Sequence, residues 1–275
     1  MKINYASDLH LEYFSDGKDA CHYLGLPRHG DVLVLAGDIC AIRDIKNFRY
    51  FFEQVSSKFG HVVYVPGNHE YWNSGYESID DADYAMMAYF ADEFSNIHYL
   101  SDEVVNINGV DFVGSTLWPK TTSIRADKLT GLHLFPDLRM VEARPGKLQS
   151  PETLNWLHER SVKFLKNECD DAVLNGNRKF FVTHFAPTWN HTDTKFAKSP
   201  YNHFFYNSLD DWFVKFGTAD HENIKAWVWG HMHKTVEASM AKAKVGCNPR
   251  GYFNQNEITF ENEFFSWNKH VNIGK

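Results

Sequence analysis

The sequence contains no hydrophobic run that approaches the ~18 consecutive apolar residues of a membrane-spanning helix. Its first residues also lack an apolar stretch of signal-peptide length, and the charged Lys2 stands at the second position. Both absences argue against membrane insertion and secretion. We therefore expect a cytoplasmic protein that does not associate with a membrane.

Cysteine is scarce, and its spacing carries no signature. Only four cysteines occur among 275 residues, and none of them forms a C-x-x-C pair. This pattern argues against a dense disulfide framework and against a structural zinc site built from thiolates. A reduced protein that relies on its own hydrophobic core is the simplest interpretation.

Basic residues are fewer than acidic ones. The chain carries 28 Lys and Arg against 35 Asp and Glu, which gives a formal net charge of -7. A dedicated nucleic-acid binder needs a basic surface to neutralise phosphates, so this class is disfavoured. No internal repeat, low-complexity tract or Gly/Ser linker divides the chain. These absences predict one domain over residues 1–275.

The hydrophobic pattern indicates a layered α/β protein. Short β-branched or aromatic runs predict buried strands, and apolar residues at three- and four-residue spacings predict helices. Strands are expected at residues 2–7, 31–36, 62–65, 97–100, 104–107, 110–117, 180–183, 226–229 and 258–260, and helices at 45–59, 76–94 and 151–169. Two stretches without a clear pattern, near 119–150 and 190–207, are expected to be loop excursions.

Five polar clusters each follow one of the expected strands. They are Asp8-Leu9-His10, Gly37-Asp38, Gly67-Asn68-His69-Glu70, His184 and Gly230-His231-Met232-His233. Ligand sites of layered α/β proteins gather at strand ends, so these clusters can converge on one site. The glycines in three of the clusters permit sharp turns and close approach of the backbone.

The residue types in these clusters are metal ligands. Asp8 and His10 stand two residues apart, so in an extended chain their side chains point to the same side and can chelate one ion. The same argument holds for His231 and His233. Carboxylate, imidazole and amide donors without thiolate suit manganese, iron or zinc. Seven candidate ligands are too many for one tetrahedral ion and predict two metals that share a carboxylate.

With these five blocks in this order, the sequence resembles the calcineurin-like metallophosphoesterase superfamily, and in particular its small bacterial and phage members. The resemblance implies a four-layer α/β/β/α sandwich of two facing sheets flanked by helices. It also implies two divalent ions, manganese first, with iron, zinc or nickel as alternatives. The implied ligands are Asp8, His10 and His233 for the first metal, Asn68, His184 and His231 for the second, and Asp38 as the bridge between both.

The same resemblance implies roles for the residues around the metals. His69 would bind no metal; it would stabilise the phosphoryl oxygens and protonate the leaving oxygen beside the bridging Asp38. Glu70 would hold a neighbouring histidine or the loop in place. The guanidinium of Arg250 could clamp a phosphate, although an Arg in a turn can equally be a solvated charge. Trp72 could stack on a nucleobase, but packing under the loops is the favoured alternative.

Departures from the family pattern narrow the substrate. Ser/Thr protein phosphatases continue the second block as Asp-Arg-Gly and place a phosphate-gripping Arg before the third. Here the second block reads Gly37-Asp38-Ile39-Cys40, and Pro66 takes the place of that Arg. We therefore expect hydrolysis of a small-molecule phosphoester or nucleotide by metal-activated water, with a phosphodiester or cyclic phosphate ahead of a monoester. A nuclease acting on DNA or RNA and a catalytically silent metal-binding scaffold are the alternatives.

Overall fold

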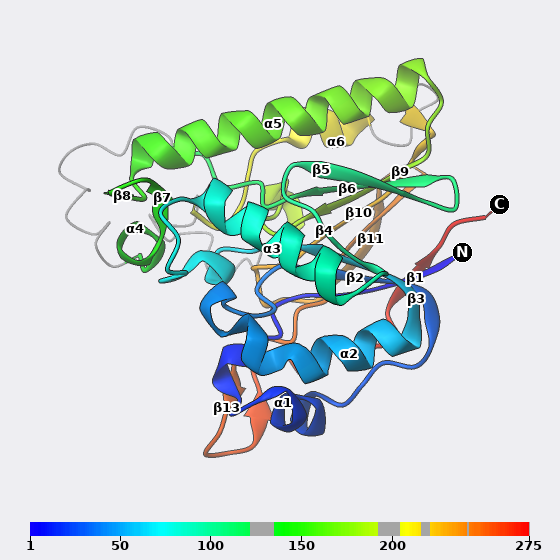
Figure 1. The fold of residues 1–275 in the computed structure, drawn as a ribbon. Helices are drawn as coiled ribbons and strands as arrows, with labels where there is room; N and C mark the ends of the chain where they lie inside the picture. The colour runs from blue at the N-terminus through cyan, green and yellow to red at the C-terminus, as the bar shows by residue number, and fades with distance from the viewer. Residues whose placement is uncertain (122–134, 192–203, 216–220, 241, 275) are drawn as a thin grey trace.

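The computed structural model describes residues 1–121, 135–191, 204–215, 221–240 and 242–274, and two β-sheets form its centre (Figure 1). The first sheet has the strand order β15-β1-β2-β3-β4, with β1 Lys2–Ala6, β2 Gly30–Ala36, β3 Phe59–Val65, β4 Ile97–Tyr99 and β15 His270–Asn272. The second has the order β11-β12-β10-β9-β6-β5, with β5 Glu103–Ile107, β6 Val110–Ser115, β9 Lys179–Thr183, β10 Ile224–Trp229, β11 Val236–Met240 and β12 Ala243–Cys247.

Helices and two small hairpins surround these sheets. The α-helices are α1 Gly17–Leu24, α2 Arg49–Lys58, α3 Ile79–Glu93, α4 Asp137–Met140, α5 Pro151–Leu174 and α6 Asp210–Lys215. Short 3-10 helices are η1 Leu11–Tyr13, η2 Ile42–Phe48, η3 His69–Tyr71 and η5 Trp189–His191. The hairpins pair β7 Glu142–Arg144 with β8 Lys147–Leu148, and β13 Phe253–Asn254 with β14 Thr259–Phe260.

Alternation along the central strands produces the layers. In β2, Val32 and Val34 belong to a buried cluster that also contains Phe180 of the second sheet, whereas Leu33 belongs to the cluster on the helical side. In β9, Phe181 packs away from the first sheet. Because successive side chains point to opposite faces of a strand, each sheet contributes one face to a shared core and one face to a helical layer.

The outer faces are covered by helices. Phe52 and Val55 of α2 pack against the first sheet, and Leu165 and Cys169 of α5 pack against the second. Helices α1 and α2 lie on one side of the sheets and α5 on the other (Figure 1). The expected four-layer α/β/β/α sandwich is therefore confirmed.

Several elements differ from the sequence expectation. The helix expected at 45–59 begins as the 3-10 helix η2 and becomes α-helical only at Arg49. Helix α1 was not expected, because only Gly17, Ala20 and Leu24 of its eight residues are buried and no clear apolar stripe results. Its start is set instead by Asp16, whose side chain accepts hydrogen bonds from two backbone N–H groups of the first turn.

The two expected loop excursions are described only in part. The first holds α4 and the hairpin of β7 and β8, while its residues 122–134 lie outside the described ranges. Residues 192–203 of the second lie outside them as well. Among the described residues, no helix combines the length and the apolar character needed to span a bilayer.

The sheet topology determines where the polar clusters meet. Strands β1 to β4 run parallel to one another, as do β6, β9, β10 and β12. Within the two large sheets, as far as the structure describes them, β15, β11 and β5 are the strands antiparallel to their neighbours. The carboxyl ends of the parallel strands in each sheet therefore lie at one edge. Loops that leave β1, β2, β3, β9 and β10 consequently gather at one end of the sandwich.

Asp83 on α3 is a buried carboxyl group that should make stability depend on pH. Tyr71 and Tyr99 donate hydrogen bonds to its Oδ1 at 2.7 and 3.0 Å, and Ser101 donates to Oδ2 at 2.7 Å. Burial outweighs these bonds and raises the pKa of Asp83 to about 6. Because the folded pKa exceeds the ordinary value of about 3.9, the contribution of Asp83 is fully present below that value and is lost as pH rises through about 6.

The variant Asp83→Asn keeps the size of the side chain and removes its ionisation. We expect its free energy of unfolding, relative to that of the native chain, to increase by up to ~3 kcal/mol when the pH is raised from about 4 to about 7. Urea unfolding of both proteins at both pH values measures this change. Other titrating groups cancel because the two proteins are compared at the same pH, and a difference that does not vary with pH would contradict the raised pKa.

Candidate metal centre

The five polar clusters converge at the carboxyl ends of the strands. The backbone N–H of Asp8 donates to the carbonyl of Gly37 at 2.9 Å, and that of Gly230 donates to the carbonyl of His184 at 3.0 Å. The N–H of His231 donates to both carboxylate oxygens of Asp8, at 3.0 and 3.1 Å. Loops from the two sheets are thus joined into one site before any side chain meets a ligand.

Five of the candidate ligands have left-handed backbone conformations. They are Asp8, His10, Asp38, His231 and His233, with φ angles of 53°, 48°, 54°, 65° and 45°. The extended chain expected for Asp8-x-His10 and His231-x-His233 is therefore wrong, because both segments turn sharply at each ligand. Non-glycine residues with positive φ are strained and cluster at functional sites.

Two glycines allow the loops to approach one another closely. A Cβ atom at Gly37 would lie 2.2 Å from Nδ1 of His184, and one at Gly67 would lie 2.2 Å from Oδ1 of Asp38. Neither contact is possible for a real side chain. The glycines that precede Asp38 and Asn68 in the sequence are therefore required by packing at the site itself.

Asp8, His10 and His233 form a first group of candidate ligands. Nε2 of His233 lies 3.3 Å from Oδ1 of Asp8 and 3.3 Å from Nε2 of His10. One donor atom from each of the three residues lies within 4.8 Å of the other two. The first of the two sets implied by the resemblance is thus assembled around one point.

The second group surrounds His184. Its Nε2 lies 3.0 Å from Oδ1 of Asn68, 3.2 Å from Nδ1 of His231 and 3.4 Å from Oδ1 of Asp38. Asp38, His184 and His231 again place donor atoms within 4.8 Å of one another. All members of the second implied set are therefore brought together.

Asp38 connects the two groups. It lies in a second triad with His10 and His69, whose donor atoms also fall within 4.8 Å. Its two carboxylate oxygens face different partners, since Oδ1 is near His184 and Oδ2 lies 4.0 Å from Nε2 of His69. This is the position that a carboxylate shared by two ions would occupy.

The charges of the cluster fit divalent cations. Asp8 and Asp38 are almost completely buried, yet neighbouring histidines hold the pKa of both carboxyl groups below the usual range against the effect of burial. Burial would lower the pKa of His184, but Asp38 raises it to about 9, and Asp8 and Glu261 likewise raise that of His233 to about 10. Buried carboxylates need a positive charge close by to offset the loss of hydration. Divalent metal ions provide such a charge, and they bind oxygen and imidazole donors of this kind.

Three histidines are oriented from behind. Each directs Nε2 into the site, and its Nδ1 hydrogen-bonds to an oxygen on the far side of the ring. The pairs are His10 with Glu12 at 3.1 Å, His184 with the carbonyl of Ala36 at 3.1 Å, and His233 with Glu261 at 2.5 Å. An acceptor behind Nδ1 places the proton there and leaves the Nε2 lone pair free for a metal.

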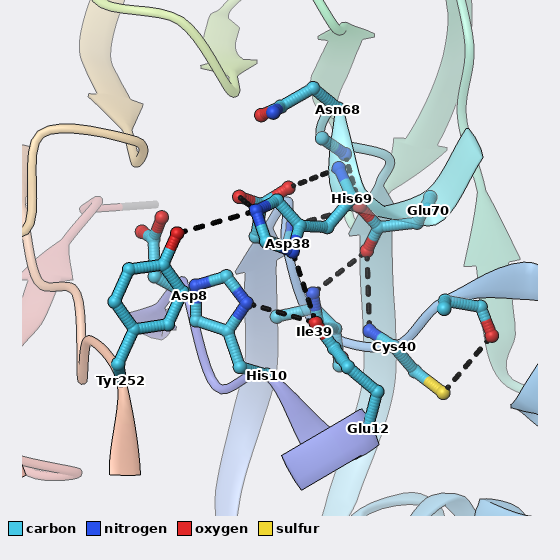
Figure 2. A network of polar contacts seen from close by, with 12 residues as sticks. Asp8, His10, Glu12, Asp38, Ile39, Cys40, Asn68, His69, Glu70 and Tyr252 are labelled. Atoms are coloured by element: carbon cyan, nitrogen blue, oxygen red, sulfur yellow. Dashed lines mark hydrogen bonds and ion pairs between the residues drawn. The ribbon is translucent and has the colours of Figure 1, made fainter. Parts of the chain in front are cut away.

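Glu70 supports the loops after β2 and β3 (Figure 2). Its buried carboxyl group accepts hydrogen bonds from the backbone N–H groups of Asp38, Ile39 and Gly67 at 3.0, 2.7 and 2.8 Å, and from the hydroxyl of Tyr64 at 2.7 Å. Burial, together with the charge of Asp38, raises its pKa to about 7. Of the two roles expected for Glu70, these contacts favour the support of a loop.

His69 lies beside the cluster with its Nε2 turned toward Tyr252 (Figure 2). Its backbone N–H donates to Oδ1 of Asp38 at 2.9 Å, its Nδ1 lies 3.1 Å from Oε1 of Glu12, and its Nε2 lies 3.4 Å from the hydroxyl of Tyr252. The ring of Trp72 stacks on it with the centroids 3.5 Å apart. Burial acts against ionisation, but Asp38 and Glu12 raise the pKa of His69.

Sequence reasoning missed three acidic residues: Glu12, Asp137 and Glu261, which contacts Nδ1 of His233. Glu12 contacts Nδ1 of both His10 and His69, and its place two residues after His10 was a signal that could have been used. Asp137 accepts hydrogen bonds from Nδ2 of Asn68 at 2.9 Å and from Nε1 of Trp72 at 2.6 Å. Because its amide nitrogen is engaged there, Asn68 turns its oxygen toward the second group. Asp137 lies in an unpatterned stretch, where nothing in the sequence marks it.

Arg250 is placed differently from the ligand candidates. Its guanidinium carbon lies 3.5 Å from the ring centroid of Phe260 and 5.2 Å from that of Phe265. Its backbone N–H donates to the carbonyl of Ser7 at 2.9 Å. A phosphate-clamping role for Arg250 stays a prediction that these contacts do not favour.

A cavity of about 410 Å³ opens beside the two groups. Asp38, Asn68, His69, His231 and His233 line its polar side. This volume falls within the range that binds small organic molecules. Candidate ligands and the candidate proton donor thus face one space that can hold a substrate.

Glu12→Gln tests the support behind His10 and His69. The amide keeps the shape of the side chain but removes the charge that both imidazoles contact. We expect the affinity of the stripped protein for Mn²⁺ to fall about 10–100-fold, the usual cost of losing such an outer partner. Calorimetric titration measures it, with the exposed Glu103→Gln on β5 as the matched control. An affinity equal to that of the control would contradict this role.

Comparison with known proteins identifies the class. The model of the calcineurin-like phosphoesterase family matches residues 1–235, and the chain belongs to this family. It is accordingly a metallophosphoesterase, a hydrolase that acts on phosphoric ester bonds, within a family that depends on two metals. The resemblance inferred from the five blocks is confirmed.

Particular relatives show how far the likeness extends. The chain is 29% identical over 269 residues to the uncharacterized protein L509 of Acanthamoeba polyphaga mimivirus, over 91% of each chain. The phosphopantetheinyl hydrolase PptH of Mycobacterium tuberculosis has a similar structure, with a TM-score of 0.60 and 20% identity over 91% of this chain and 89% of that chain. A dimetal phosphatase from Danio rerio gives a TM-score of 0.44 and 12% identity over 90% of this chain and 86% of that chain. The PptH likeness supports the fold.

Proposed function

We propose that this enzyme binds two divalent ions, manganese first, and hydrolyses a phosphate ester of a small molecule or nucleotide by metal-activated water. The observation that carries the proposal is the pair of ligand groups joined by Asp38 beside one cavity. A phosphodiester or cyclic phosphate stands ahead of a monoester, because the Arg that protein phosphatases place before the third block is replaced by Pro66.

Each ligand residue has a defined task in this proposal. Asp8, His10 and His233 would hold one ion, Asn68, His184 and His231 would hold the other, and Asp38 would be shared between them. Bound divalent ions of this kind neutralise phosphoryl oxygens and lower the pKa of water to about 7. Glu70 joins the loop of Asp38 to the loop of Asn68, because it accepts hydrogen bonds from the backbone N–H groups of Asp38, Ile39 and Gly67.

His69 is the proposed proton donor. Glu12 and the ring of Trp72 fix the orientation of its imidazole, and the residue lines the cavity. From there it can hydrogen-bond to a phosphoryl oxygen and deliver a proton to the leaving oxygen. No covalent intermediate is required, because water is the nucleophile.

The test is hydrolysis by protein that has been stripped with a chelator and titrated with Mn²⁺, Zn²⁺, Fe²⁺ or Ni²⁺. Bis-p-nitrophenyl phosphate and p-nitrophenyl phosphate share one leaving group and separate diester from monoester activity. Metal-dependent cleavage that favours the diester supports the full proposal, and preference for the monoester rejects its ranking of substrates. No cleavage with any metal, despite two bound equivalents, rejects hydrolysis of simple esters and favours the scaffold alternative.

A nuclease remains the competing enzyme activity. It predicts cleavage of plasmid or oligonucleotide that weakens steeply with salt, because counterion release drives nucleic-acid binding. We expect no such cleavage at low salt, in keeping with the net charge of -7. Strand cleavage at a rate comparable with that of the small diester would replace the proposed substrate class.

A further inference from the structure

The cavity beside the ligand groups is also lined by apolar side chains, and apart from Trp72 the proposed reaction assigns them no task. The residues that form this apolar wall are Trp72, Phe135, Pro136, Phe204, Phe205 and Met232. They come from four separate stretches of the chain. Aromatic side chains that line a concave site beside a few convergent polar groups are typical of pockets for organic ligands.

These apolar side chains lie next to a candidate metal ligand and next to the candidate proton donor. The ring of Phe205 lies 5.3 Å from that of His231 at an interplanar angle of 30°. The ring of Trp72 stacks on His69. A phosphoryl group held between the ligand groups would therefore direct its organic substituent against this wall.

The charges of the described wall do not suit a second anionic group. Beyond the ligand groups and His69, the charged residues described in the lining are Asp137 and Glu261, and both are acidic. The described lining contains no Lys or Arg. A further phosphate or carboxylate on the substrate would meet the like charge of Asp137 and Glu261, with no Lys or Arg among the described lining residues to offset it.

We propose that the substrate is an ester with one phosphoryl group and an uncharged, apolar organic part that packs against Phe204, Phe205 and Trp72. The proposal rests on the proposed function, because the phosphoryl group must be held by the two ligand groups. It adds that the wall selects the organic part, and that Phe205 determines specificity. Compounds with two or more phosphates are disfavoured.

Non-hydrolysable phosphonates test this selection without turnover. Isothermal titration calorimetry of the Mn²⁺-loaded protein compares methylphosphonate, phenylphosphonate and 4-carboxyphenylphosphonate. Burial of the ring predicts that phenylphosphonate binds about tenfold or more tightly than methylphosphonate, with a more negative heat-capacity change. The carboxylated probe should bind more weakly than phenylphosphonate.

Variants locate the effect on the wall. Phe205→Ala should reduce the ratio of phenyl to methyl affinity to about threefold or less, while Phe205→Leu should keep most of it. Tyr84→Ala is the control, because Tyr84 is an aromatic residue that is 72% exposed on α3. If the alanine variant does not fold, the ratio of phenyl to methyl affinity in the native protein still decides whether the cavity selects an apolar group.

The outcomes separate the two proposals. Equal binding of the methyl and phenyl probes overturns the apolar selection and leaves phosphoryl recognition intact. Tighter binding of the carboxylated probe overturns the claim that the organic part is uncharged. If neither simple phosphonate binds the metal-loaded protein, phosphoryl recognition itself fails, and both the proposed function and this inference are rejected.

Discussion

Replacement of His69 by alanine is expected to lower kcat by about 10²–10⁴-fold while two equivalents of metal stay bound. The loss follows from the position of His69, since it lines the cavity and its Nδ1 is held by Glu12. The variant also removes the ring that stacks on Trp72, so circular dichroism should accompany the assay. Metal content by mass spectrometry and steady-state kinetics give the two readouts.

The leaving group sharpens this test. A general acid matters most when the departing oxygen is strongly basic, so the loss should be larger for an alkyl leaving group than for p-nitrophenolate. The exposed His29→Ala serves as a control for the removal of an imidazole elsewhere. Loss of metal from the His69 variant would reassign this residue as a ligand, which its triad with His10 and Asp38 makes a real alternative.

Asp38→Ala is expected to abolish stoichiometric metal binding. Its carboxylate faces both ligand groups, so its removal takes a donor from each ion and leaves two sets of imidazoles without the shared anion. Outer partners of a metal site already account for 10–100-fold in affinity, and the loss of a shared ligand should exceed that. Equilibrium dialysis against Mn²⁺ measures the stoichiometry directly.

The controls for Asp38 separate binding from folding. The exposed Asp92→Ala on α3 changes the net charge equally and should bind both ions. Asp38→Asn retains an acceptor for the backbone N–H of His69 and should fold like the native chain, yet bind metal poorly. Two equivalents bound with native affinity in the alanine variant would overturn the dinuclear proposal.

The sequence was sufficient to predict the layers and the meeting point of the polar clusters. The apolar runs at residues 31–36 and 180–183 were enough to predict strands that are buried on both faces, because such strands have few polar positions. The position of the site could be predicted from the strand ends, because the loops that follow parallel strands lie at the same end of the sheet. Asp8, Asp38 and His184 could be placed together on that argument alone.

What could not be predicted depends on contacts between distant segments. Asp137, which contacts Asn68, lies in a stretch without any hydrophobic pattern. Strand β15 near the C-terminus pairs directly with β1 near the N-terminus. Local periodicity carries no information on such pairings. The left-handed conformations at the ligands were missed for a related reason, since propensity disfavours them and only tertiary contacts maintain them.

The left-handed backbone conformations of these candidate ligands imply that thermal stability and metal binding place opposite demands on the same residues. Each non-glycine residue held at positive φ costs the folded chain about 1 kcal/mol or more, and five of them lie in the loops that carry the candidate metal ligands. Glycine at Asp8, His231 or His233 would relieve that strain and remove a donor at the same time. A laboratory selection for thermal stability alone, without an activity screen, would therefore accumulate substitutions at these positions and yield sturdier proteins with an impaired metal centre.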